Sequence, residues 1–390
     1  MNSTDSLQPG LRRIQSRSLV VGLAGLGICA VGGWFAGEQF FRSYLIAYLF
    51  WLGIALGCLP IVMLYHLTGG AWGSVIRRLV ESGTRTLPLM ALLFVPLLFG
   101  VHSLYEWARP ERVAIDSMLQ HKSPYLNVPF FAVRTLVYFA AWIVFAFYLN
   151  KWSSEQDRTG DIRFIRRFQL LSGPGIVVYG LTVTFASIDW AMSLEARWFS
   201  TIYGMLFVVG QVLAAFAFVI PVLAMMAGHK PMADVVSPNH FNDLGNLMLT
   251  FVMLWAYISF SQFLIIWSGN LTEEIPWYLR RMQNGWEWVA VLLLLFHFFI
   301  PFLLLLSRAA KRRIQVLSAI ALAVMFMRLV DVYWLIDPAF YPNRLTIHWL
   351  DLIATIGIGG LWISTFVRQL RKKPLLPLQD PNLVAREETT

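Results

Sequence analysis

Charged residues are scarce in this sequence. Asp, Glu, Lys and Arg make up 14% of its 390 residues, whereas hydrophobic residues make up 57%. Soluble domains carry about 25% charged residues, so this composition excludes an ordinary soluble domain and indicates a polytopic membrane protein. The net charge of +9 would also suit a nucleic-acid-binding protein, but in a membrane protein the basic residues gather in the loops on one side. We therefore expect lipid, and no nucleic acid, as a partner.

Cysteine is almost absent, since only Cys29 and Cys58 occur and both lie in apolar runs. The chain therefore has no CxxC or CxxCH motif and no disulfide framework. This absence removes protein-ligated iron–sulfur clusters and covalently attached c-type haem from the chain.

The histidines do not form the pattern that b-type haem requires. Two haems stacked across a bilayer need four histidines, paired at matched depths on facing helices. In the predicted spans, His66 lies at an inner end, His297 near the middle, and His102 and His348 near outer ends. We expect no metal and no redox cofactor bound by this chain.

Long apolar runs dominate what is present. A bilayer core of about 30 Å needs roughly 20 apolar residues in a helix. Ten stretches qualify, so the predicted fold is all-α with ten transmembrane helices. We place them near 18–36, 44–66, 86–106, 128–149, 169–190, 200–227, 244–268, 285–306, 314–336 and 346–368, within a membrane domain 18–368 flanked by tails 1–17 and 369–390.

The basic clusters predict the orientation of these helices. They fall in loops or tails on the side of both termini, namely Arg77/Arg78/Arg85, Arg163/Arg166/Arg167, Arg308 to Arg313 and Arg371 to Lys373. The positive-inside rule then makes both termini cytoplasmic. Most ionisable residues within spans consequently lie toward the outer face.

Ionisable residues within spans cost about 2.5–3.5 kcal/mol or more, so they are functional candidates. The spacing of His102 and Glu106 (i, i+4) predicts one shared face at the outer end of the third helix. Arg328 and Asp331 (i, i+3) either pin helix packing or take part in function. Residues near the interface are interpreted as structural, because they can reach water: Glu195, Arg197, Arg344 and His348.

Asp189 is the most informative of these residues. It ends an apolar run, and Trp190 and Trp198 mark the interface beyond it. Such a carboxylate must be protonated, paired or reached by water. We expect Asp189 to converge with His102 and Glu106 near the outer face. The full candidate proton path comprises His66, His102, Glu106, Asp189, Tyr179, Thr182, Thr184, His297, Arg328, Asp331, His348 and Asp351.

Short motifs recur at an interval of four helices. The fifth helix ends in "SIDW" and the ninth in "VDVYWLIDP", so an outer-end Asp is followed by Trp in both. We therefore expect two four-helix bundles, helices 2–5 (44–190) and helices 6–9 (200–336), with one flanking helix at each end.

Several longer motifs carry a family resemblance. They are "LYHLTGGAWG", "SIDWAMSLEARWFSTIYG", "DLGNLMLTFVMLWAYISFSQFLIIWSGN" with the following "EEIPWYLRR", and "RLVDVYWLIDP". Together with the helix count, they resemble the NrfD-like (polysulfide-reductase-like) membrane proteins. Within that family the chain is similar to the smaller of two such subunits in bacterial alternative complex III, a quinol:electron-acceptor oxidoreductase.

The resemblance implies a multi-pass subunit of the bacterial inner (plasma) membrane and respiratory electron transport. Its implied partners are a second, larger NrfD-like subunit, a periplasmic iron–sulfur subunit and c-type cytochrome subunits. Quinol, iron–sulfur clusters and c-type haem would belong to those partners. This chain would supply scaffold and a path for protons.

Two other functions remain open. One is a quinone-binding redox subunit in its own right. The other is a secondary transporter, which is less favoured because transporters carry matched broken helices in their two halves. Pro174 is expected to interrupt the fifth helix, and the ninth helix has no counterpart.

Overall fold

The computed structural model describes residues 7–377 and 379, and every regular element among them is helical. Ten helices or helix runs are long and apolar enough to cross a membrane, which confirms the predicted class of the fold. They are α1 (Gln8–Phe35), α2 (Gly37–Thr68), α3 (Ala71–Thr84) with α4 (Leu87–Phe99), α8 (Val128–Thr159), α9 (Arg163–Trp190), α10 (Tyr203–Met226), α12 (Pro238–Gly269), α14 (Trp286–Leu293) with η3 (Leu294–Phe299) and α15 (Ile300–Leu306), α17 (Ile314–Ile336), and α18 (Trp349–Leu370).

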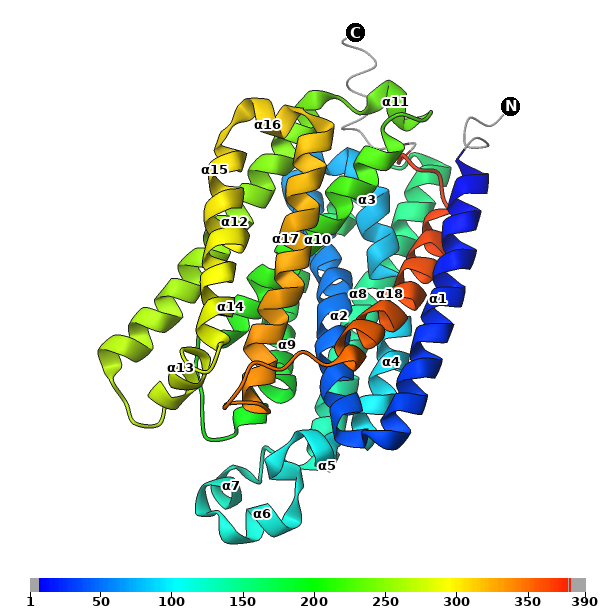
Figure 1. Ribbon diagram of the computed structural model, residues 1–390. Helices are drawn as coiled ribbons and strands as arrows, with labels where there is room; N and C mark the ends of the chain where they lie inside the picture. Colours follow the sequence, from blue (N-terminus) through cyan, green and yellow to red (C-terminus); the bar gives the residue numbers. More distant parts are fainter. Residues whose placement is uncertain (1–6, 378, 380–390) are drawn as a thin grey trace.

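The remaining elements are short and lie between these runs. They are α5 (Val101–Leu104), η1 (Glu106–Ala108), α6 (Pro110–Ile115), α7 (Ser117–Lys122), η2 (Met192–Glu195), α11 (Met232–Val235), α13 (Ile275–Arg281), α16 (Arg308–Arg312) and η4 (Asp337–Ala339). Figure 1 shows α6 and α7 projecting together beyond the long helices.

Several boundaries and breaks differ from those expected, among them that α8 ends at Thr159 instead of 149, and three others bear on the fold. Helix α1 begins at Gln8, inside the segment expected to be a tail. The third run covers 71–99 instead of 86–106, because the residues expected as a basic loop form the buried helix α3. Helix α9 continues unbroken through Pro174, so the expected interruption is wrong. Pro174 removes one backbone donor, and the flanking turns continue the helix around it.

Helix α2 lies at the centre of the molecule. It is hydrophobic on all sides, which is typical of a fully surrounded helix, and nearly all its residues from Ser43 to Met63 are buried. It packs against α3, α4, α9, α10 and α18. At Gly57 the backbone of α10 approaches so closely that a side-chain Cβ would overlap the Gln211 carbonyl.

The helices around α2 form two sets of mutual neighbours. In the first helix group, α2, α3, α4, α8 and α9 contact one another in a closed ring. In the second helix group, the same holds for α10, α12, α14, α15 and α17. Contacts of α10 with α2 and α9 join the two groups.

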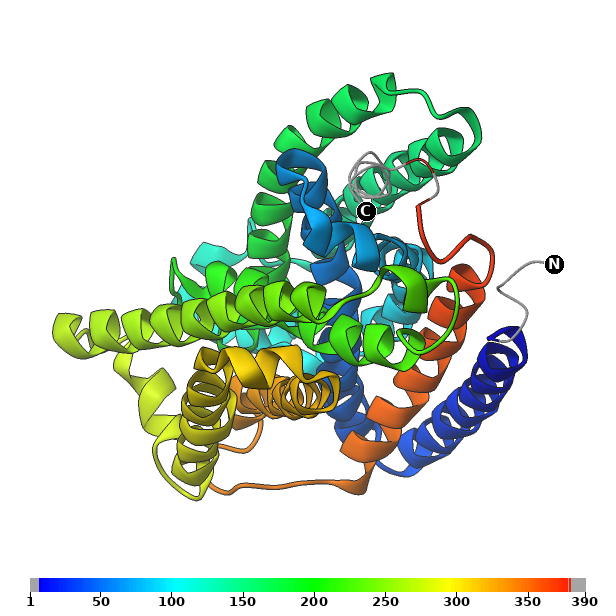
Figure 2. The same ribbon diagram turned by 90° about the horizontal axis from the view of Figure 1, so that it is seen from above.

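Helices α1 and α18 pack together outside both groups (Figure 2). Their contact depends on glycines, because a Cβ at Gly25 would lie 2.8 Å from the Cα of Gly357. Small residues let helix backbones approach closely, which is the usual basis of packing between membrane helices.

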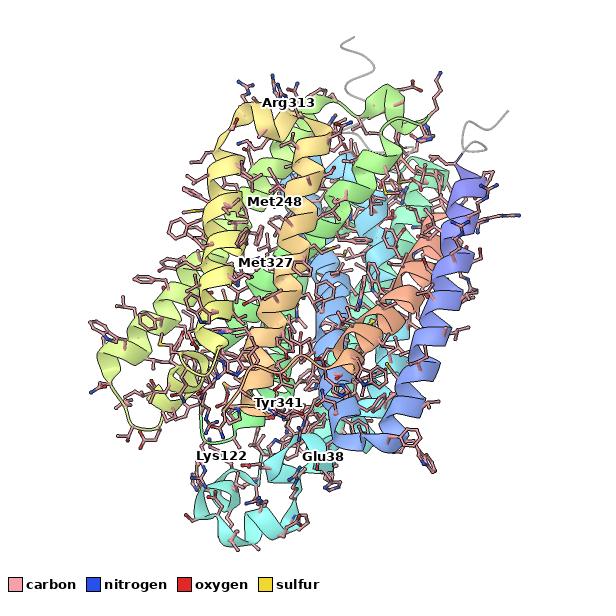
Figure 3. The ribbon with its side chains drawn as sticks, viewed as in Figure 1. Glu38, Lys122, Met248, Arg313, Met327 and Tyr341 are labelled. Atoms are coloured by element: carbon pink, nitrogen blue, oxygen red, sulfur yellow. The ribbon has the colours of Figure 1, made fainter. Side chains whose placement is uncertain are left out.

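The two ends of the molecule carry different segments of the chain. We call the end where α1 begins and α18 ends the terminal face, and the end that carries α6 and α7 the opposite face (Figure 1). Figure 3 shows Arg313 at the terminal face, Lys122 at the opposite face, and Met248 and Met327 between them. Both methionines are buried, so apolar side chains lie between the two faces.

Candidate functional site

Asp189 lies near the opposite face and is fully buried, with 0% exposure. Arg134 of α8 donates to both carboxylate oxygens, from Nε to Oδ2 at 2.8 Å and from Nη2 to Oδ1 at 2.9 Å. The Tyr138 hydroxyl donates to Oδ2 at 2.8 Å. A bidentate Arg–carboxylate pair with a third donor is among the strongest arrangements for a buried charge. Asp189 is therefore paired, which is one of the three states that its position requires.

Arg134 has a second set of partners on its outer side. Its guanidinium carbon lies 3.8 Å from the ring centroid of Tyr125 and 4.4 Å from that of Phe130, and Nη1 donates to the Tyr125 carbonyl at 2.8 Å. Burial raises the pKa of Tyr125 to about 12, so its ring remains an uncharged surface for the cation. Arg134 thus lies between the Asp189 carboxylate and an aromatic cradle.

His102 and Glu106 do not share a helix face as the sequence predicted. His102 belongs to α5 and Glu106 to η1, because Tyr105 between them is extended, with φ −115° and ψ 127°. Both side chains are exposed, and the Nδ1 atom of His102 is 2.7 Å from the Ala108 carbonyl.

Tyr105, which the sequence did not single out, links this corner to α9. Its hydroxyl donates to the Trp190 carbonyl at 2.9 Å, and burial raises its pKa. The opposite-face site is therefore built by Arg134, Tyr138 and Asp189, with Tyr105 beside it. His102 and Glu106 are exposed and are not among the hydrogen-bond partners of Asp189.

Hydroxyl groups continue inward along α9. The Tyr179 hydroxyl donates to Gln211 Oε1 at 2.8 Å. Thr182 accepts from the Trp142 indole at 2.8 Å and donates to the Val178 carbonyl at 2.7 Å. Thr184 donates to the backbone of its own helix. Tyr179 and Gln211 are thus a polar pair halfway between the two faces. Both threonine hydroxyls instead donate to the backbone of α9.

His66 lies at the terminal-face end of the first helix group. Its ring stacks on Phe168 with centroids 4.0 Å apart and an interplanar angle of 2°. Its Nε2 has no hydrogen-bond partner, although the residue is only 9% exposed. A cavity of about 250 Å³, lined partly by Arg77 and Gln156, adjoins it. This volume holds several water molecules.

A buried charge cluster on α3 was missed by the sequence analysis. Arg77 and Arg78 both pair with Glu81, at 3.0 and 2.7 Å, and Ser153 donates to Glu81 at 2.6 Å. Each of the three charged residues is at most 2% exposed. Their spacing in "RRLVES" (i, i+3 and i, i+4) was the available signal, but it was assigned to a loop.

The C-terminal segment after α18 closes over this cluster. Lys373 lies 3.4 Å from Glu81 Oε2 and donates to the Asn150 carbonyl at 3.2 Å. Burial lowers the pKa of Lys373 to about 8, and the nearby Glu81 carboxylate offsets part of this lowering.

The second helix group contains another buried Arg–Asp pair. Arg328 donates to Asp331 within α17, and the Trp255 indole donates to the same oxygen at 3.1 Å. His297, in the π-helical turn η3, is 0% exposed, and both of its ring nitrogens lack a partner. Its ring meets that of Trp255 edge-on, with centroids 4.5 Å apart.

The interfacial residues make contacts that hold helix ends in place. His348 and Asp351 form a reciprocal cap at the start of α18, and Ser43 of α2 donates to Asp351 at 2.5 Å. Glu195 accepts from Arg280 and Arg281 at 2.7 and 2.9 Å. These contacts support the structural interpretation of His348 and Glu195.

Comparison with known proteins adds no identification. No family model matches the chain, and no curated protein matches it. Within residues 7–377 and 379, no group of three or more His, Cys, Asp or Glu side chains is arranged to hold a metal ion.

Proposed function

We propose that the chain is a membrane subunit of a quinol:cytochrome c oxidoreductase, or of one with another periplasmic acceptor, of the alternative complex III type. It serves as scaffold and carries protons through the first helix group. The motifs described above and the ten membrane-length helices support this assignment. Quinol oxidation, iron–sulfur clusters and c-type haem belong to partner subunits in this proposal.

The proposal includes the two-bundle architecture and the orientation. The closed rings of contacts in the two helix groups support two four-helix bundles related by an internal repeat. The terminal face is then cytoplasmic, and α6 and α7 meet the periplasmic partners. The second, larger NrfD-like subunit would lie beside this one in the membrane.

The observation that carries the proposal is the placement of titratable groups at both ends of α9. His66 stacks on Phe168, and Asp189 lies roughly 32 Å farther along the helix at about 1.5 Å per residue. This matches the hydrocarbon thickness of about 30 Å. Tyr179 and Gln211 lie near the midpoint. Buried polar groups at three depths of one helix group provide relay points that an apolar scaffold alone does not need.

Water must connect these points. Each interval is roughly 15 Å, so about four or five waters at ~2.8 Å spacing would fill it. The cavity beside His66 supplies the inlet. Between Gln211 and Trp190 the cavity volume is only about 10 Å³, which is at the lower limit for a single water. Proton passage therefore requires this part of the group to open.

Arg134 acts as the gate in this proposal. While it pairs with Asp189, its guanidinium donates to both carboxylate oxygens. The rings of Tyr125 and Phe130 already contact the cation, and they would still hold it if its hydrogen bonds to Asp189 broke. Loss of these hydrogen bonds, with Arg134 held by its aromatic contacts, would free Asp189 to bind a proton from the interior and pass it outward.

The test is proton release per quinol oxidised by the whole complex in sealed vesicles. The double variant Arg134→Gln/Asp189→Asn removes the titratable group without leaving a lone buried charge, and it should lower the ratio while quinol oxidation continues. The matched control is Arg197→Gln/Asp116→Asn, which removes an ion pair at the same face with an exposed arginine and should leave the ratio unchanged. An unaltered ratio in both variants would refute the proton path.

A further inference from the structure

A large cavity lies in the second helix group, away from the proposed proton path. Its volume is about 590 Å³, and α12, α13, α14 and α17 enclose it. This is within the 300–1,000 Å³ range of small-molecule sites. Both views show α12 extending away from the other helices at the end that adjoins α13 (Figures 1 and 2). The walls are mostly apolar and aromatic, and they include Trp255, Phe263, Trp277, Tyr278 and Phe298.

Two polar atoms at this cavity lack partners. Gln262 lines it and is 2% exposed, yet its Oε1 accepts no hydrogen bond. Trp334 also lines it, and its buried indole Nε1 donates none. An unsatisfied buried donor or acceptor costs about 1–3 kcal/mol. A ligand hydroxyl can donate to Gln262 and accept from Trp334, so hydroxyl chemistry satisfies both groups.

The mouth of the cavity faces the lipid. Tyr257 and Phe260 line it and are 65% and 61% exposed, and both lie within the membrane-length helix α12. A ligand therefore enters sideways from the bilayer. Part of the wall belongs to the π-helical turn η3, namely Leu294, Phe298 and Phe299. Such turns often occur at functional sites.

The charges nearby select the kind of head group. Asp331 reaches the cavity, but Arg328 already neutralises it. A charged lipid head group would lose its hydration here without gaining an opposite charge. A neutral head avoids that cost. The aromatic walls favour a flat ring, since offset and edge-on ring contacts add stability beyond the buried area.

We propose that this cavity binds a neutral lipid whose head is a flat, hydroxylated ring and whose apolar tail leads out between α12 and η3. Both a quinol and a polycyclic alcohol have this chemistry. The bound lipid accounts for the unpartnered atoms of Gln262 and Trp334. The site belongs to the second helix group and involves no electron transfer, so it does not depend on the proposed proton path.

Binding to the purified full-length chain in neutral detergent tests the proposal. The probes are decylubiquinol, its O-methylated derivative, cholesterol and dioleoylphosphatidylcholine, each measured as retained ligand by native mass spectrometry and by competition. We expect decylubiquinol or cholesterol to bind, and their relative affinity distinguishes the two sources. The O-methylated derivative should bind at least about threefold more weakly than decylubiquinol, because it cannot donate to Gln262.

Three variants localise the site. Ala256→Trp fills the cavity and should weaken binding at least about tenfold, whereas the matched control Ala140→Trp changes an exposed alanine of α8 and should not. Gln262→Met keeps the shape, removes the acceptor and should weaken binding about fivefold. Thermal unfolding of each variant checks that it remains folded. Equal binding to Ala256→Trp and wild type, or displacement of the ring probe by phosphatidylcholine at equal concentration, would overturn the proposal.

Discussion

The two buried Arg–Asp pairs use the same chemistry in different settings. In the first helix group, Arg134 and Asp189 join two helices, and three donor groups surround the carboxylate. In the second, Arg328 and Asp331 belong to one helix, and Asp331 borders a cavity of about 590 Å³. The first pair is therefore enclosed by protein, whereas the second has open volume beside it.

This difference teaches what a buried ion pair does in a membrane protein. A pair between helices fixes their relative position and is costly to break, because removing one partner leaves an uncompensated charge. The salt bridge of a pair within one helix holds no second helix in place, although the Trp255 indole of α12 also donates to Asp331. Such a pair neutralises itself locally, and it leaves the neighbouring volume available for a neutral ligand.

The largest expected effect comes from removing one carboxylate. Asp189→Asn leaves Arg134 buried without a counter-charge and should destabilise the protein by about 3–5 kcal/mol. Asp331→Asn should cost less, about 1–2 kcal/mol, because Arg328 and Asp331 belong to one helix and their salt bridge holds no second helix in place. Equilibrium unfolding in mixed detergent measures both values. Equal losses would show that joining two helices adds nothing to the stabilisation by a buried pair, and would remove the contrast between the pairs.

The second prediction concerns the third donor to Asp189. Tyr138→Phe removes one hydrogen bond to an ionised carboxylate, and it should destabilise the protein by about 1.5–3 kcal/mol. Tyr148→Phe is the control, since Tyr148 is an exposed tyrosine on the same helix. The same unfolding measurement applies. A loss no greater than that of the control would mean that Arg134 alone satisfies Asp189.

The third prediction tests how tightly the second pair is confined on its α10 side. A Cβ at Gly210 would overlap the Arg328 guanidinium, whereas the space around Gly180 is open. Gly210→Ala should therefore cost about 1–3 kcal/mol through overpacking, and Gly180→Ala should be neutral or slightly stabilising. If both variants unfold alike, Arg328 moves freely and the pair is not confined by α10.

The fourth prediction is a pH dependence at the terminal face. Burial lowers the pKa of Lys373 from 10.5 to about 8, so between these values the unfolded chain binds more protons than the folded one. Wild-type stability should then rise with pH across this window relative to Lys373→Met, which lacks the group. Unfolding of both proteins at pH 7.5 and pH 10 measures the difference. Parallel pH profiles would contradict the expected shift.

The sequence predicted the helices better than the contacts. Apolar runs set the ten spans, because lipid forces the backbone to satisfy itself within each helix. The burial of Asp189 also followed from a local signal, because it ends an apolar run just before Trp190. Near Tyr105 the helical spacing failed, since one extended residue placed His102 and Glu106 on separate elements.

Ion-pair partners that are far apart in the sequence gave little signal in the local sequence. Arg134 and Asp189 are 55 positions apart, and each resembled an isolated charge near an interface. The basic residues of α3 were assigned to a loop, because an average hydropathy treats a charged residue the same whether or not it is paired. Arg77, Arg78 and Glu81 compensate one another inside the helix, so they can be buried. The cavity of the second group arises from the path of α12, which no short motif predicts.

The central position of α2 bears on how the chain assembles during synthesis. Its tyrosines obtain partners early, because the hydroxyls of Tyr44 and Tyr48 donate to backbone carbonyls of α4, the next long helix but one to emerge. The Trp51 indole must wait longer, since it donates to the Thr355 carbonyl of α18, the last helix made. Until α10 and α18 arrive, the remaining surface of α2 faces lipid, which is as apolar as the helices that later replace it. The order of translation thus leaves α2 with few unsatisfied polar groups while the protein around it is still incomplete.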